Sequence, residues 1–454
     1  MLYLVLKLIL RTGLWVFFRR FVVRNRHLMP ARGPLLVVAN HPNTFMDPIV
    51  IASLLPQQVY FIAKSTVFSS PLHNWLLPHM NLIPIHRSQD RPGVPLDNEA
   101  TFKAIYQALT NHKTLLIFPE GTSFNERRLR KLKTGTARMA LGAAASLPEV
   151  ANLQILPVGL NYSDPTRFRS DVFVNVGKPI AVAPYLAQYQ QDEKGTVNEL
   201  TDRIRQQLEK LIVVTPTDDE DVLVRQIEQV YKETLAAQTP LEAPRHVRDF
   251  LLTRAIMKGL AHFLETQPLR VEQFRDKMRS YVGQLEELDL KRLPTVEENN
   301  VLLRQTLVRT LLLTLTLPLY LYGLFNNYLA YIIPSKVADA LTEEQEFRAP
   351  IMLSVGIFSF PILYALQASV FWHFWPDTLY LLLYLISLPL SGFFAHRYWN
   401  ILLRVREHWL LLRLFMNNSP VAASLKRQRQ ELISELEGAR KEYLHQQTDS
   451  QSLG

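Results

Sequence analysis

Three long runs without a charged side chain limit the folds that this chain can adopt. They cover residues 310–335, 349–376 and 378–396, and only Asp377 separates the second run from the third. About 20 consecutive apolar residues in a helix span the hydrocarbon core of a bilayer. A small soluble domain has little interior in which to bury three such helices. We therefore expect membrane segments within residues 306–400, followed by a basic helical tail at residues 401–454.

Basic side chains flank these runs at both ends. Because lysine and arginine collect on the cytoplasmic side of a membrane, both flanks favour the cytoplasm. Three complete spans would separate the two flanks, so we expect one run to be re-entrant or interfacial. The first run is the candidate, because Pro318, Asn326 and Asn327 interrupt its apolar character. The flanking residues are Arg304, Arg309, Arg397, Arg404, Arg406 and Arg413.

The first stretch of the chain, residues 1–29, is apolar but carries Lys7, Arg11, Arg19 and Arg20. A secretory signal has an unbroken apolar core and a small-residue cleavage site, and this stretch has neither. The spacing is typical of a helix that lies in the membrane interface, with basic side chains reaching the headgroups. A core helix of the first domain is the alternative.

Short apolar runs alternate with helix-length stretches over residues 30–189, which predicts an α/β domain. The runs cover residues 35–39, 59–62, 82–85, 114–118, 155–160 and 172–176, and helices are expected at 98–110 and 134–145. This alternation favours a mostly parallel sheet covered by helices. Residues 190–305 are more highly charged, with Leu223, Ile227, Val230 and Tyr231 on one helical face. We expect an accessory region of amphipathic helices there.

The composition excludes several chemistries. None of the 454 residues is a cysteine, which rules out disulfides, iron–sulfur clusters, zinc–thiolate sites and a cysteine nucleophile. His73, His79 and His86 lack metal-ligand spacing, so we expect no metal and no cofactor. The formal net charge of +9 suits anionic headgroups and an anionic substrate. No nucleic-acid-binding motif accompanies this charge, so no nucleic-acid partner is expected.

Four polar clusters follow directly on four of the apolar runs. They lie at residues 40–47, 86–87, 119–123 and 161–162. In open α/β sheets, ligands bind outside the carboxyl ends of the strands. The four clusters are therefore expected to meet in one crevice.

The side chains in these clusters favour one kind of reaction. His41 suits a general base, because imidazole titrates near neutral pH, and Asp47 suits the acid that orients it. Arg87 offers a planar set of donors for phosphate, and Glu120 offers an acceptor for substrate hydroxyls. No Ser or Cys nucleophile stands beside the His–Asp pair. The attacking hydroxyl would then belong to the substrate, a small phosphorylated alcohol.

Structural roles compete with these assignments. Asp47 followed by Pro48 is also a favourable helix start, with Asp at the N-cap and Pro at the first position, and the two roles of Asp47 are compatible. His41 has the alternative of a hydrogen-bonded structural histidine, and Arg87 that of a surface charge. The basic run at residues 127–133 suits either phosphate or a solvated, lipid-facing loop.

In order along the chain, these motifs resemble those of the phospholipid/glycerol acyltransferase family, over about residues 30–185. The resemblance implies an α/β acyltransferase domain with a mostly parallel sheet. It also implies an enzyme that transfers an acyl group from acyl-CoA or acyl-ACP to a hydroxyl of a glycerol phosphate. The motifs are Asn40-His41 with Asp47, Ile83-Pro84-Ile85-His86-Arg87, Phe118-Pro119-Glu120-Gly121-Thr122 and Leu156-Pro157-Val158-Gly159.

The resemblance implies a role for each matching residue. His41 deprotonates the acceptor hydroxyl and Asp47 supports it, while Pro157 helps to shape the acyl-donor side. Because a thiolate is a good leaving group, no covalent enzyme intermediate is needed. We expect an integral membrane enzyme, in contact with membrane lipids, whose catalytic domain lies on the cytoplasmic face. The residues that would bind the glycerol phosphate are Asn40, Arg87, Glu120, Gly121, Thr122 and Ser123.

The chain departs from the family pattern at two places. Five residues separate His41 from Asp47, where the family usually has four, and Asn43 is a competing partner for the histidine. Ser123 stands where many members carry arginine, so basic side chains of the following loop are candidate substitutes. These candidates are Arg127, Arg128 and Lys133.

Both departures resemble the branch that acylates glycerol-3-phosphate and dihydroxyacetone phosphate, which implies lysophosphatidate as the product and a place in phospholipid biosynthesis. That branch also carries membrane segments after its catalytic domain. Three alternatives stay open. They are acylation of lysophosphatidate to phosphatidate, a non-catalytic lipid-binding module, and a hydrolase that uses the same histidine with water.

Overall fold

The computed structural model describes residues 2–30, 33–86, 99–238, 244–290, 293, 299–416 and 420–452. The chain forms two compact units. The first, called the sheet unit here, contains Met1–Val214 and Ile333–Ser359. The second, called the helical unit, contains Thr215–Ile332 and Phe360–Gly454. Each unit is described by itself.

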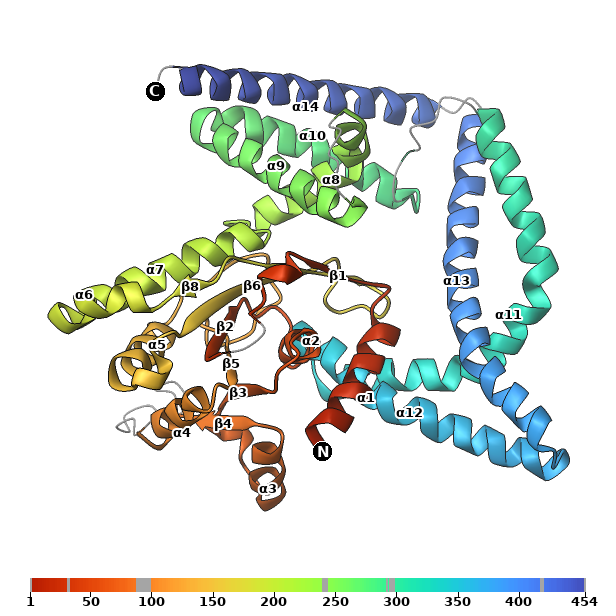
Figure 1. The fold of residues 1–454 in the computed structure, drawn as a ribbon. Helices are drawn as coiled ribbons and strands as arrows, with labels where there is room; N and C mark the ends of the chain where they lie inside the picture. Colours follow the sequence, from red (N-terminus) through yellow and green to blue (C-terminus); the bar gives the residue numbers. More distant parts are fainter. Residues whose placement is uncertain are drawn as a thin grey trace. The chain divides into compact units, whose positions relative to one another are not determined.

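An eight-stranded sheet, counted over the described residues, forms the centre of the sheet unit (Figure 1). Its order is β1-β7-β6-β2-β5-β3-β4, and β8 pairs with β6. Only the pairings of β6 with β7 and with β8 are antiparallel, so the prediction of a mostly parallel sheet is confirmed. The strands are β1 (Arg20–Arg24), β2 (Leu35–Ala39), β3 (Val59–Lys64), β4 (Leu82–Ile85), β5 (Thr114–Ile117), β6 (Gln154–Tyr162), β7 (Asp171–Val176) and β8 (Ile180–Ala181).

Helices cover both faces of this sheet, and side chains of β2 alternate between the two. Leu36 and Val38 face a core shared with α4 (Glu99–Thr110), α5 (Gly135–Ser146) and α7 (Glu193–Leu211). The intervening residues of β2 face a core shared with α1 (Leu2–Phe17), α2 (Met46–Leu54) and the first part of α12 (Gln345–Phe374). Burial on both faces explains why β2 is continuously apolar. The remaining helices of this unit are α3 (Pro71–His79) and α6 (Leu186–Gln191).

Two predicted boundaries differ from the structure. The segment at residues 1–29, predicted as an interfacial helix, also contains β1, which pairs in parallel with β7. The region at 190–305, predicted as accessory, begins with α7, and Leu200, Ile204 and Leu208 of α7 are buried in the core of the sheet unit. The amphipathic period of α7 was visible in the sequence, but the surface it packs against was not.

Helix α1 has two apolar faces. Leu14 and Phe17 are buried in the core of the sheet unit, as the alternative interpretation held. Leu8 and Trp15 are more than 60% exposed, which favours a membrane interface for the other face. Lys7 does not point to solvent as expected for a headgroup contact, because its ammonium donates to the Leu55 carbonyl.

Four helices form the core of the helical unit: α8 (Asp218–Gln238), α9 (Arg245–Thr266), α10 (Pro268–Glu287) and α14 (Pro420–Ser452). The helical face predicted on α8 is confirmed, since all four of its residues are buried. The helical tail expected at residues 401–454 includes α14, which is not simply exposed to solvent. Leu425 and Leu432 of α14 are buried against the other helices.

Three helices of the described chain are long and apolar enough to cross a membrane. They are α11 (Asn299–Leu341), α12 and α13 (Thr378–Met416). The first run lies in one continuous helix, α11, from Asn299 to Leu341, and its assignment as the re-entrant or interfacial segment stays a prediction. Asn327 does not break the helix, since its amide donates to the Leu388 carbonyl and accepts from the Tyr364 hydroxyl. Polar groups that are satisfied by neighbouring helices are tolerated at membrane depth.

Candidate active site

Three of the four polar clusters meet at one edge of the sheet, because β6, β2 and β5 are neighbours. Asn40 and His41 follow β2, Glu120 follows β5, and Tyr162 ends β6. The remaining cluster, at residues 86–87, comes after β4, and β3 separates β4 from β5 in the sheet. Its key residue, Arg87, lies outside the described residues, so its assignment to phosphate stays a prediction.

His41 and Asp47 form a hydrogen-bonded pair. The distance from His41 Nδ1 to Asp47 Oδ2 is 2.8 Å, and the Asp47 side chain is 0% exposed against 17% for His41. The imidazole stacks on the Phe118 ring at a centroid distance of 3.9 Å and an angle of 10°. An ionised carboxylate only accepts hydrogen bonds, so Nδ1 carries the proton and Nε2 keeps its lone pair. The ring is thus fixed in position and in tautomer, with one edge reaching the surface.

Asp47 is itself held by two further donors. The backbone N–H of Asn43 donates to Oδ2 at 2.7 Å, and the Tyr162 hydroxyl donates to Oδ1 at 2.7 Å. Burial, followed by the nearby Asp47 charge, raises the pKa of Tyr162 well above its usual value. The phenol therefore stays protonated and keeps donating at neutral pH. A buried carboxylate that accepts from three donors is fixed in orientation.

The extra residue between His41 and Asp47 is absorbed by a tight turn. The Asn43 carbonyl accepts from the N–H groups of Met46 and Asp47, and Thr44 has a φ of 24°. A positive φ is strained for a residue with a branched side chain. The Thr44 hydroxyl donates to the Glu346 carbonyl of α12 at 2.8 Å, which anchors the turn. Asn43 thus contacts the aspartate through its backbone and does not replace it.

The N-cap expected at Asp47 is wrong in position. Helix α2 begins at Met46, its N-cap is Phe45, and no side-chain cap bond is formed. Asp47 lies in the first turn, and its carboxylate turns back to the His41 loop. The acidic side chain still lies near the positive end of the helix dipole, where a negative charge is favoured.

Glu120 joins the first and third motifs. Its Oε1 accepts from the His41 N–H at 3.0 Å, and its Oε2 accepts from the Arg130 N–H at 3.0 Å. Burial raises the pKa of Glu120, while these backbone donors and His41 act in the opposite direction. Both carboxylate oxygens thus hold backbone N–H groups beside the His–Asp pair, and the contact of Glu120 with substrate hydroxyls stays a prediction.

The other predicted residues lie around this centre. The amide of Asn40 is engaged at both ends by the Leu160 backbone, at 3.0 and 2.7 Å, so it ties β2 to β6 immediately before His41. Thr122 and Ser123 are half-buried in the loop that follows β5. Pro157 is buried inside β6, in register with Val38, and its place on the acyl-donor side stays a prediction.

Lys133 extends across Gly121. Gly121 has a φ of 77°, and a Cβ placed on it would lie 2.6 Å from Lys133 Nζ. Only glycine allows both this conformation and this close approach. The ammonium is thereby brought to the Phe-Pro-Glu-Gly motif, and its use as a phosphate ligand stays a prediction. Arg130, on the same loop, instead covers the Phe124 ring and pairs with Glu126.

Sequence reasoning missed the roles of two residues. Tyr162 was noticed in the polar cluster at residues 161–162, but nothing local relates it to Asp47, 115 positions earlier. Phe118 was part of a motif without a role of its own, and the structure places its ring against His41. Strand order would have supplied the signal for Tyr162, since β2 and β6 are adjacent and end at the same edge.

Replacement of Tyr162 by phenylalanine is expected to lower kcat roughly five- to tenfold, because a lost hydrogen bond of this kind is worth about 1 kcal/mol. The KM values should change little, since Tyr162 contacts Asp47 and acts as a positioning residue. Steady-state kinetics of the purified full chain measures both constants. Tyr60→Phe, on β3 of the same sheet, is the matched control. An unchanged kcat in Tyr162→Phe would contradict the positioning role.

Comparisons with known proteins address the first part of the chain. The family model described as Acyltransferase matches residues 20–161. The chain is 33% identical over 187 residues to glycerol-3-phosphate O-acyltransferase 1 of Saccharomyces cerevisiae, covering 40% of this chain and 24% of the yeast protein. It is 25% identical over 171 residues to a chloroplastic 1-acyl-sn-glycerol-3-phosphate acyltransferase of Brassica napus, covering 37% of this chain and 47% of that protein.

A solved structure is also similar. The 1-acyl-sn-glycerophosphate acyltransferase of Thermotoga maritima matches with 22% identity and a TM-score of 0.32, over 44% of this chain and 79% of that one. The chain spans about a quarter of the length of the two yeast glycerol-3-phosphate O-acyltransferases that it matches.

The mostly parallel sheet with helices on both faces and the family match together define the class of this domain. Residues 20–161 form a domain of the Acyltransferase family. The resemblance seen in the sequence motifs is therefore confirmed for this part of the chain.

Proposed function

We propose that this protein transfers a fatty acyl group from an acyl thioester to a hydroxyl of glycerol-3-phosphate, which gives lysophosphatidate. The observation that carries the proposal is the chain of hydrogen bonds from Tyr162 through Asp47 to His41. This arrangement lies in a domain that is similar to yeast glycerol-3-phosphate O-acyltransferases. It supplies a positioned base and no nucleophile of its own, which suits attack by a substrate hydroxyl.

The reaction follows from the tautomer of His41. Nε2 takes the proton of the acceptor hydroxyl while that oxygen attacks the thioester carbonyl carbon. The new C–O bond forms and the C–S bond breaks. The thiolate leaves either as the anion or after it takes the proton back from the imidazolium. Asp47 stabilises the transient imidazolium through Nδ1. The thioester supplies the acyl group as acyl-CoA or acyl-ACP, and either donor satisfies this chemistry.

The phosphate of the acceptor needs a cation beside this base. Lys133 lies against the Gly121 backbone, and the loop that carries it is fixed by Arg205 of α7, whose guanidinium donates to the carbonyls of Leu129 and Arg130. A cation held on an anchored loop binds phosphate with less entropy loss than a free side chain. Arg87, Thr122 and Ser123 remain predicted partners of the same group.

Lys133→Met is expected to raise the KM for glycerol-3-phosphate about tenfold, because a hydrogen bond to a charged group contributes about 1.5–3 kcal/mol. The kcat should fall less, since the base is untouched. Lys131→Met, two positions earlier on the same loop and exposed, is the matched control. Initial rates at varied acceptor concentration measure the effect. Equal KM values in the two variants would remove Lys133 from the phosphate site.

Membrane placement suits a lipid product. Three helices are apolar enough to span a bilayer, and α1 presents Leu8 and Trp15 to its surroundings. Each buried methylene of an acyl chain contributes about 0.8 kcal/mol, so lysophosphatidate formed at the interface stays in lipid. The arginine-rich flanks favour the cytoplasm, but three complete spans would separate them, so a cytoplasmic face for the sheet unit stays a proposal.

A second candidate is acylation of lysophosphatidate to phosphatidate. The similarity to the Brassica napus and Borreliella burgdorferi 1-acyl-sn-glycerol-3-phosphate acyltransferases favours it. The yeast relatives match with higher identity, and they support the first step.

A side-by-side acceptor assay separates the candidates. The purified full chain, reconstituted in lipid, is given a labelled long-chain acyl-CoA with glycerol-3-phosphate, dihydroxyacetone phosphate or lysophosphatidate. We expect glycerol-3-phosphate to give the highest kcat/KM. A preference for lysophosphatidate would move the protein to the second step, and thioester cleavage without an acceptor would indicate a hydrolase. Binding of lipid without turnover of any acceptor, with acyl-ACP also tested, would indicate a non-catalytic module.

A further inference from the structure

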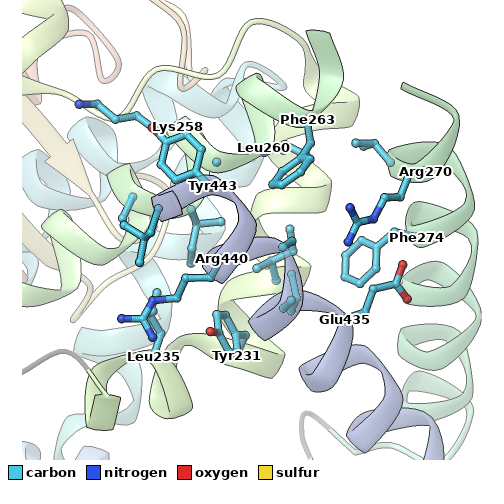
Figure 2. A pocket seen from close by; sticks show the side chains of 18 of the residues that line it. Tyr231, Leu235, Lys258, Leu260, Phe263, Arg270, Phe274, Glu435, Arg440 and Tyr443 are labelled. Carbon is cyan, nitrogen blue, oxygen red and sulfur yellow. The ribbon is translucent and has the colours of Figure 1, made fainter. Parts of the chain in front are cut away.

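The helical unit contains a cavity that the proposed transfer reaction does not use. It has a volume of about 360 Å³ and lies between α8, α9, α10 and α14 (Figure 2). Its walls are mainly apolar, with Leu260, Phe263, Phe274 and Leu436 among the side chains that line it. Protein interiors are close-packed, with few voids larger than a water molecule. An apolar space of this size falls in the range of small-molecule sites.

The charged groups at this cavity are distributed unevenly. Around Phe274, each charged side chain has a partner of opposite sign: Arg270 pairs with Glu442 and Glu435 pairs with Lys277, both at 2.8 Å. Lys258 also lines the cavity, and the described residues offer it no ion pair. Figure 2 shows Lys258 and Arg440 on the side opposite Arg270 and Phe274. The charges on one side of the cavity are therefore paired, and the other side carries a cation that can bind an anion.

The cationic side also offers polar groups. Arg440 donates to the Gln238 amide oxygen at 2.8 Å, and the Gln238 amide donates in turn to Glu437 at 2.6 Å. Beside Arg440 lies the buried Tyr231 hydroxyl, and burial raises the pKa of this phenol while the nearby guanidinium acts in the opposite direction. Lys258 is an exposed lysine of α9 at the rim of the cavity, where it can reach the acidic end of a ligand.

We propose that this cavity binds a single-chain amphiphile with an anionic head group. The acyl chain lies among Leu260, Phe263 and Phe274, and the head group is bound by Lys258, with Arg440 on the same side of the cavity (Figure 2). The shared chemistry of one hydrocarbon chain and one anion fits both a long-chain fatty acid and lysophosphatidate. Such ligands partition into bilayers, and the unit that contains the cavity also contains most of the candidate membrane helices. This site is separate from His41, and its occupancy does not depend on acyl transfer.

Photolabelling tests the proposal directly. The full chain in phosphatidylcholine vesicles is labelled with palmitate that carries a diazirine on its chain, and labelled peptides are mapped by mass spectrometry. We expect labels on the cavity faces of α9, α10 and α14, competed by unlabelled palmitate, by lysophosphatidate or by both, and the stronger competitor identifies the natural source of the anion. Competition by neither, or labels confined to α11, α12 and α13, would overturn the proposal.

Two variants separate the head-group and chain contributions. Lys258→Met should weaken palmitate binding about tenfold, as expected for loss of one charge-assisted contact, without weakening the binding of hexadecanol. Leu260→Trp should fill the cavity and abolish the binding of both palmitate and hexadecanol. Lys426→Met, an exposed lysine on α14, and Leu269→Trp, an exposed position on α10, are the matched controls.

Equal labelling in Leu260→Trp and its control, with the variant folded by thermal unfolding, would contradict the site. Equal weakening of palmitate and hexadecanol in Lys258→Met would contradict the head-group assignment. If inorganic phosphate competes with the photolabel as strongly as unlabelled palmitate does, the cavity is a simple anion site, and this result would overturn the amphiphile proposal.

Discussion

Replacement of His41 by alanine is expected to lower kcat about 10³-fold, within the range that general base catalysis contributes. The imidazole is the group that the proposed reaction needs in order to remove the acceptor proton, and its Nδ1 is already engaged by Asp47 at 2.8 Å. Binding of the thioester and of the glycerol phosphate does not require the ring, so both KM values should change little. Turnover of labelled glycerol-3-phosphate by the purified full chain gives the measurement.

The control for His41→Ala must separate chemistry from folding. The ring stacks on Phe118 and is largely covered, so its removal leaves a small void and costs some stability. His27→Ala removes an exposed histidine from the same unit and should leave kcat unchanged. Thermal unfolding of both variants checks that the fold persists. A folded His41→Ala variant that retains more than a tenth of wild-type kcat would exclude His41 as the base.

Asp47→Asn is expected to lower kcat by roughly 10²- to 10³-fold, because an amide in place of the carboxylate favours the wrong histidine tautomer. The side chain is 0% exposed and accepts hydrogen bonds from His41, Asn43 and Tyr162. An amide nitrogen cannot accept these bonds, so at least one buried donor loses its partner. We also expect a loss of about 1–3 kcal/mol in the free energy of unfolding.

Chemical unfolding and initial rates on the same Asp47→Asn preparation measure the two effects. Asp202→Asn, an exposed position on α7, is the matched control and should be silent in both. A variant that loses stability but keeps its kcat would show that Asp47 holds the fold and plays no part in orienting the base.

The sequence predicted well those strands of the sheet that are buried on both faces. The six predicted strands are all present, because strands covered by helices on both faces are continuously apolar, as β2 and β5 are. β1 was missed since Arg20 and Arg24 bound a short apolar core at the sheet edge, and charged ends there resemble an interfacial segment. The carboxyl-end rule then brought His41, Asp47 and Glu120 together correctly.

What the sequence could not supply are contacts between distant segments. Tyr162 reaches Asp47 only because β6 lies beside β2, and Lys133 reaches Gly121 only through the path of its loop. Helix α14 has its buried Leu425 and Leu432 seven positions apart among many charges, too sparse a stripe to predict packing. Hydropathy also could not anticipate that Asn326 and Asn327 of α11 would be satisfied by neighbouring helices.

The proposed reaction depends most on the proton that His41 removes from the acceptor, and one substrate analogue tests this step directly. In an analogue of glycerol-3-phosphate with a thiol in place of the primary hydroxyl, the nucleophile has a pKa of about 8.5 and ionises without a base. Rates of wild type and His41→Ala with this analogue, corrected for the reaction without protein, are compared with their rates on glycerol-3-phosphate. We expect the roughly 10³-fold defect of the variant to shrink to less than about tenfold with the thiol. A defect equally large with both acceptors would contradict the assignment of His41 as the general base.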